Sequence, residues 1–134
     1  MNENEYNLQR FIDAQETEYA TALSEIRSGG KRSHWIWYIF PQQKGLGHSY
    51  NSEYYGLDGT GEARAYLAHP LLGARLREIS AALLEHKGRT TIRRLMGSQI
   101  DVLKLRTCML LFDSISPDDI FAEVLDAFFN TKEE

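Results

Sequence analysis

Cysteine is nearly absent from this chain, and long apolar runs are missing. Cys108 is the single cysteine among 134 residues, which excludes a disulfide framework and a thiolate metal site. No apolar run approaches the roughly 20 residues that span a bilayer. The N-terminal residues, Met1 to Tyr6, are polar and acidic, unlike a secretory signal. We therefore expect a cytoplasmic protein with no membrane partner.

Basic residues are outnumbered by acidic ones, 15 to 19. The formal net charge is -4 and the pI is near 5.6, which argues against nucleic acid as a partner. The four histidines show no i, i+4 pair and no carboxylate at ligand spacing, so we predict neither a metal site nor a cofactor. Charge is segregated, however, because the charged residues of 86–106 are basic except for Asp101, and those of 113–134 are acidic except for Lys132. These segments are either two solvated faces or, at the basic one, an anion-attracting mouth.

What the chain has in abundance is helical periodicity. Its length suits one domain over residues 1–134, with polar ends at 1–4 and 131–134 that we expect to be frayed. Apolar residues recur every three or four positions in most of the chain, and no sustained alternation predicts strands. The expected fold class is all-α: a single multihelical, bundle-like domain with about five to eight helices and no substantial sheet.

Local signals place most helix ends. We expect helices over about residues 8–28, 62–68, 70–87, 91–95, 99–114 and 117–129, with a buried helical turn over 35–40. Pro70 and Pro117 are expected at the first helical position, and Ser98 followed by Asp101 resembles a capping box. Residues 42–61, with five glycines and three tyrosines, show no period and are expected to be irregular or broken by a short helix.

The densest chemistry lies in residues 31–49. Large aromatic residues crowd positions 35–40, and polar residues flank them on both sides. Gly45 and Gly47 are separated by one residue, a spacing that lets backbone amides form an anion nest. An aromatic wall with polar groups at both ends is typical of a small-ligand pocket. The same cluster is also consistent with plain core, in which the neighbouring polar side chains only satisfy buried indole and phenol groups.

Two functional hypotheses follow, and whether the protein is an enzyme stays open. In the first, it binds, and in an enzymatic version hydrolyses, an anionic or nucleotide-like small molecule. Proton transfer would fall to His34, His48 or Glu62. The ligand would be bound by Lys31, Arg32, Ser33, Trp35, Trp37, Tyr38, Gln42, Lys44, Gly45, Gly47, Ser49, Asp101 and Lys104. In the second, a non-catalytic protein-interaction module, the aromatic segment is core and the acidic last helix or the basic segment contacts a partner.

Several strings of the sequence are specific enough to compare with known families. The most specific is His34-Trp35-x-Trp37-x-x-Phe40-Pro41-Gln42. Others are Gly29-Gly30-Lys31-Arg32, Gly45-Leu46-Gly47, His69-Pro70-Leu71-Leu72-Gly73 and Lys104-Leu105-Arg106. These strings extend over nearly the whole chain. In them the chain resembles the small, chiefly bacterial all-α family described as domain of unknown function eighteen-ten.

The resemblance implies a multihelical bundle without an established activity. A fainter similarity, in the His-Pro-leucine helix and the aromatic–glycine segment, points to the family that acts on ADP-ribose-related metabolites. The chain departs from the resembled family in two places. His48 stands where that family commonly shows arginine, and Thr107-Cys108 stands where it commonly shows a serine pair. The second departure counts against a catalytic serine.

Overall fold

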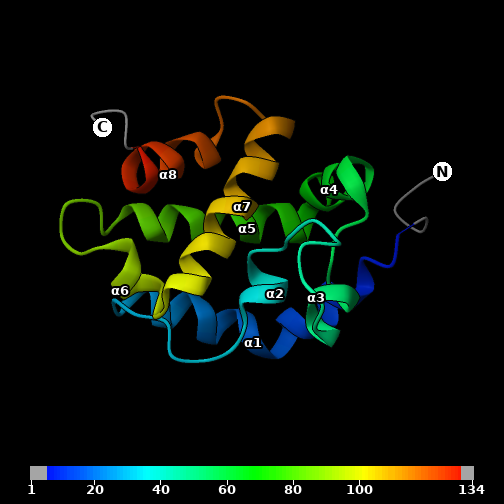
Figure 1. Ribbon diagram of the computed structural model, residues 1–134, viewed down its shortest axis with the longest axis horizontal. Coiled ribbons are helices and arrows are strands. Elements are labelled where there is room, and N and C mark those ends of the chain that lie inside the picture. Colours follow the sequence, from blue (N-terminus) through cyan, green and yellow to red (C-terminus); the bar gives the residue numbers. More distant parts are fainter. Residues whose placement is uncertain (1–5, 131–134) are drawn as a thin grey trace.

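The computed structural model describes residues 6–130, and within them eight helices account for most of the chain (Figure 1). These are α1 (Gln9–Arg27), α2 (Ile36–Ile39), α3 (Tyr50–Tyr54), α4 (Gly59–Ala68), α5 (Pro70–Leu84), α6 (Ile92–Met96), α7 (Gln99–Ile115) and α8 (Ile120–Phe129). The all-α prediction is confirmed, since the described range holds one isolated parallel bridge, Gln43 to Leu57, and no sheet. None of these helices is both long and apolar enough to cross a membrane. The chain ends that we expected to be frayed lie outside the described residues.

Helix α7 is the element around which the fold is built. It runs across the middle of the molecule in front of α5 (Figure 1) and packs against α2, α4, α6 and α8. A series of fully buried rings joins the helices: Phe11 of α1 meets Tyr66 of α4, which meets Phe112 of α7, which meets Phe121 of α8. Neighbouring ring centroids are 5.0 to 5.8 Å apart, the spacing of favourable aromatic pairs.

Side-chain caps fix several helix starts as the sequence predicted. His69 Nδ1 accepts hydrogen bonds from the amides of Leu71 and Leu72, which starts α5 at Pro70. Ser98 Oγ accepts from the Asp101 amide at 3.1 Å and starts α7. The side chain of Asp101 does not complete a capping box, because it is engaged by a lysine from another part of the chain.

The expected start of the last helix at Pro117 is wrong. Helix α8 begins at Ile120 and is capped by Asp119, whose carboxylate accepts from the Ile120 amide at 2.6 Å. The residue before the cap, Asp118, has a φ of 65°, a left-handed conformation that ends any continuous helical path from Pro117. Arg77 of α5 donates to the same Asp119 carboxylate, so a tertiary contact selects this cap.

The segment 42–61, expected to be irregular or broken by a short helix, contains the short helix α3 and the first turn of α4, which begins at Gly59 and not at residue 62, and it is held by a buried arginine. Arg10 of α1 donates to the carbonyl oxygens of Tyr54 at 2.7 Å and Gly56 at 3.0 Å. The same guanidinium forms an ion pair with Glu62 of α4 at 2.8 Å, with both side chains almost fully buried. Arg10 therefore fastens the end of α3 and the start of α4 to α1. A buried pair of this kind costs several kcal/mol to break, about 3–5, because one charge is left uncompensated.

Candidate functional site

Glu25 of α1 organises the segment that leads into the aromatic block. Its carboxylate accepts four hydrogen bonds: from the amides of Arg32 and Ser33, from the Ser33 hydroxyl and from the Trp35 indole N–H. Burial by itself would raise the pKa of Glu25, but these hydrogen bonds outweigh it and lower that pKa to about 2. Sequence reasoning missed this residue. The signal was there, since a carboxylate three residues after Ala22 falls on the buried stripe of α1 and needs partners.

The two tryptophans of the aromatic block have different surroundings. Trp35 is fully buried, with its indole N–H on Glu25, so its ring packs in the core instead of facing a ligand. Trp37, two residues further on, is half-buried and faces a surface hollow. A lysine ammonium group lies over each indole ring. Lys31 Nζ is 5.0 Å from the Trp35 ring centroid, and Lys104 Nζ is 3.8 Å from the Trp37 ring centroid.

A single carboxylate joins these two lysines. Asp101, in the first turn of α7, lies 2.8 Å from Lys31 Nζ and 3.8 Å from Lys104 Nζ. The side chain of Lys31 is 6% exposed and that of Lys104 is 23% exposed. Burial lowers the pKa of Lys104, and the nearby positive charge of Lys31 adds to this effect while Asp101 opposes it. Two ammonium groups therefore share one carboxylate, and Lys104 is the more loosely paired and more exposed of them.

Lys104 and Trp37 belong to a hollow of about 290 Å³, which we name the apolar hollow. It is lined by Trp37, Gln42, Gln43, Leu46, Gly47, Ser52, Ile100, Leu103, Lys104 and Thr107. Three of its large apolar side chains are unusually open to solvent: Leu46 is 63%, Ile100 66% and Leu103 54% exposed. Gln42 closes one side, with its amide nitrogen donating to the carbonyl oxygens of Phe40 and Lys104.

A second hollow, of about 320 Å³, adjoins the first, and Ile100 lines both. We name it the polar hollow; its lining is Lys31, Arg32, Ser33, His34, Met96, Gly97, Ser98, Ile100 and Asp101. Arg32 and His34 are exposed at its edge. The hydroxyl of Ser33 is engaged by Glu25, which leaves it no free hydrogen for a ligand. The two hollows together contain most of the residues that the sequence singled out.

The remaining predicted site residues lie elsewhere or have structural partners. Glu62 forms the buried pair with Arg10 and also accepts from the Asp58 amide, and it lines neither hollow. Tyr38 packs against Tyr55, with ring centroids 5.1 Å apart. Ser49 caps α3, and exposed Lys44, Gly45 and His48 line neither hollow, whereas Gly47 lines the apolar one. Across residues 6–130, no three His, Cys, Asp or Glu side chains gather as metal ligands.

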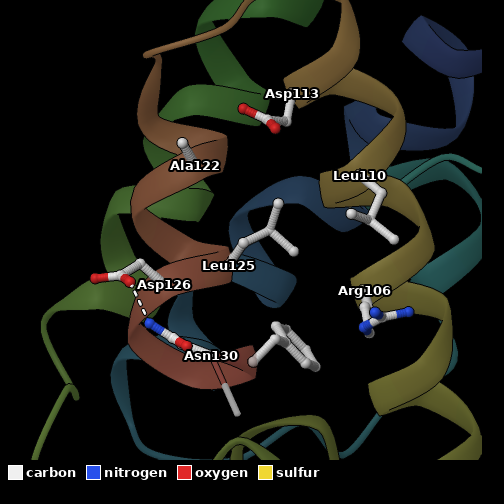
Figure 2. A pocket seen from close by; sticks show the side chains of 8 residues that line it. Arg106, Leu110, Asp113, Ala122, Leu125, Asp126 and Asn130 are labelled. Atoms are coloured by element: carbon white, nitrogen blue, oxygen red, sulfur yellow. Dashed lines mark hydrogen bonds between the residues drawn. The ribbon is translucent and has the colours of Figure 1, made fainter. Parts of the chain in front are cut away.

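A third hollow, also about 320 Å³, lies between α7 and α8. Its lining is Arg106, Leu110, Asp113, Ala122, Leu125, Asp126, Phe129 and Asn130. Figure 2 shows Leu110 and Leu125 pointing toward each other across the gap, with the Asn130 amide donating to Asp126 at 2.7 Å on the α8 side. None of the site residues expected from the sequence lines this hollow.

Fold and site together define a small all-α protein with adjoining polar and apolar hollows beside its central helix. The chain belongs to the family described as Protein of unknown function (DUF1810), whose model matches residues 5–134. The expected resemblance is thereby confirmed. The chain is also similar to the crystal structure of the conserved hypothetical protein Rv1873 from Mycobacterium tuberculosis, at 38% identity and a TM-score of 0.88. That similarity covers 93% of this chain and 89% of the other. A comparison with curated proteins finds no match.

Proposed function

We propose that this protein binds an anionic small molecule in the apolar hollow, with Lys104 as the charge partner and the Trp37 ring as a wall. The observation that carries the proposal is the shared carboxylate. Asp101 is 2.8 Å from Lys31 but 3.8 Å from Lys104, so the ammonium group that faces the hollow is incompletely neutralised. In partly buried surroundings such a charge attracts an anion more strongly than it would in water.

The polar hollow extends the positive region. Arg32 and His34 lie at its edge, next to the start of α7, where helix-end amides favour negative charge. His34 is the titratable residue of the predicted catalytic set that lines a hollow, so a hydrolytic version of the proposal rests on His34. His48 and Glu62 have no part in it, because neither lines either hollow.

A thermal-shift screen with carboxylates, sugar phosphates, nucleotides and ADP-ribose tests the proposal. A ligand present at 100 times its dissociation constant stabilises the fold by about 2.7 kcal/mol, a readily measured shift. Lys104→Met keeps the apolar stem and removes the charge, so it should abolish the shift. Arg106→Gln is the matched control, since Arg106 is also a cation of α7 but lines the third hollow. The proposal fails if no anion shifts the transition, or if both variants respond alike.

A protein-interaction module is the second candidate, and one specific observation favours it. Ile100, Leu103 and Leu110 are large apolar side chains on α7 that are 43% to 66% exposed, on the face opposite its packed side. Large apolar side chains that stay exposed along one helix face are typical of interaction sites. A Leu110→Lys variant tests this candidate, since it leaves the apolar hollow intact. It should abolish any self-association or partner binding detected by sedimentation while preserving every ligand-induced thermal shift.

A further inference from the structure

The charge carried by the apolar hollow is a single positive one. Among the described residues that line it, Lys104 has the only formal charge, and no Asp or Glu is present. Asp101 lies just outside the lining and is held mainly by Lys31. The three-residue cluster of Lys31, Asp101 and Lys104 therefore carries one net positive charge, and that charge faces the hollow through Lys104. A ligand with one negative charge would neutralise it.

Two of the side-chain hydrogen-bond donors that line the hollow are engaged within the protein. The amide nitrogen of Gln42 is committed to the carbonyl oxygens of Phe40 and Lys104. The hydroxyl of Thr107 donates to the Leu103 carbonyl at 2.9 Å. A phosphoryl group carries three acceptor oxygens and up to two charges, so it needs several donors to replace its hydration. A carboxylate needs fewer, and an ammonium with its three donors is a suitable partner.

The rest of the hollow is built for an apolar body. Trp37, Leu46, Ile100 and Leu103 line it with apolar side chains, and Lys104 Nζ lies over the ring of the first of these. Its volume of about 290 Å³ is roughly twice that of a cavity of about 150 Å³ that encloses benzene. Such a space accommodates a fused pair of rings or a ring with a short side chain. The hollow is at the lower end of the roughly 300–1,000 Å³ typical of small-ligand pockets, which favours a compact ligand over a dinucleotide.

Resting on the proposed function, we infer that the ligand is a monocarboxylate with a compact aromatic body. Its carboxylate pairs with Lys104 Nζ, and its ring lies against Trp37 between Ile100 and Leu103. This assignment names the chemical class that the site selects and sets it apart from phosphorylated ligands, which share the negative charge but not the apolar body or the single charge.

Calorimetric titration with three probes of one ring shape, 2-naphthoate, uncharged 2-naphthamide and 2-naphthyl phosphate, and with AMP tests the inference. The intact chain should bind naphthoate about tenfold or more tightly than naphthamide, since one charge-assisted hydrogen bond is lost in the amide. It should also prefer naphthoate to both phosphates. Lys104→Met should remove the preference for the acid over the amide, while Arg106→Gln should retain it. The acid–amide comparison on the intact chain needs no variant to fold.

The outcomes distinguish an error in the ligand class from the absence of an anion site. If naphthyl phosphate or AMP binds more tightly than naphthoate and depends on Lys104, the carboxylate class is wrong while the anion site stands. If naphthamide binds as tightly as naphthoate to the intact chain, or if Lys104→Met keeps the preference for naphthoate over naphthamide, the inference is overturned. If no anion binds at all, the proposed function fails together with it. A shift of the Trp37 indole N–H resonance on addition of naphthoate, with that of Trp35 unmoved, would locate the bound ring.

Discussion

Substitution of Glu25 gives the most direct test of how residues 32–35, which lead into the aromatic block, are held in place. The Glu25 carboxylate accepts four hydrogen bonds, three of them from the backbone and side chain of residues 32 and 33 and one from Trp35. Glu25→Gln preserves the size of the side chain, but it removes the charge and turns one acceptor oxygen into a donor. The amide nitrogen then faces other donors, so at least one buried N–H or O–H loses its partner.

The pKa of Glu25 sets the size of the effect. A carboxyl whose pKa falls from 4.5 to about 2 on folding stabilises the folded state at neutral pH by at most about 3 kcal/mol. Water at the half-buried Ser33 end screens part of this, so we expect the free energy of unfolding to fall by about 2 kcal/mol at pH 7. The midpoint of urea unfolding should then drop by about 1 M.

The pH dependence has a defined sign. The folded-state pKa of Glu25 is depressed, so its stabilisation is fully present above pH 4.5 and is lost as the pH falls toward about 2. The difference between the wild-type chain and Glu25→Gln should therefore be large at pH 7 and small near pH 2. Glu16→Gln, at an exposed position of the same helix, is the control and should leave the midpoint unchanged. A difference that persists at low pH, or an equal loss in the control, would refute the reasoning.

Three further results are expected. Gly73→Ala should cost about 3 kcal/mol or more in urea unfolding, as a severe overpacking, since the new methyl would lie 2.1 Å from the Leu67 carbonyl oxygen. Cys108 is fully buried and burial raises its pKa, so a disulfide-exchange reagent should label it only after unfolding by urea. Asp119→Ala should lower stability by about 1–2 kcal/mol at pH 7 through the lost helix cap. That loss should shrink as the pH falls toward about 2, because hydrogen bonding to Arg77 lowers the pKa of Asp119 to about 2.

The helices were predictable because their signals are local. His69, Ser98 and Gly97 each act within three residues of the helix end that they define, so a single sequence contains the whole signal. Pro117 misled for the opposite reason. The competing cap at Asp119 is favoured by Arg77, which lies 42 positions earlier in the chain.

The site was predictable in its composition but not in its geometry. The aromatic block pointed to Trp35 and Trp37 equally, and only the folded chain separates them, because Glu25 engages one indole and leaves the other beside Lys104. The same limit applies to Glu62. Its residue type suits acid–base chemistry, but its partner Arg10 is 52 positions away in the sequence, and no local pattern reveals that pairing.

Ile100 lines both the apolar and the polar hollow, so the size of this side chain limits the length of the ligand that the protein can bind. The isoleucine side chain at this position lies where the two hollows meet. We expect alanine there to widen the connection between the hollow beside Trp37 and the hollow beside His34, so that a longer molecule could extend into both. The size of the side chain at position 100 thus selects ligands by length, whichever residue pairs with their charge.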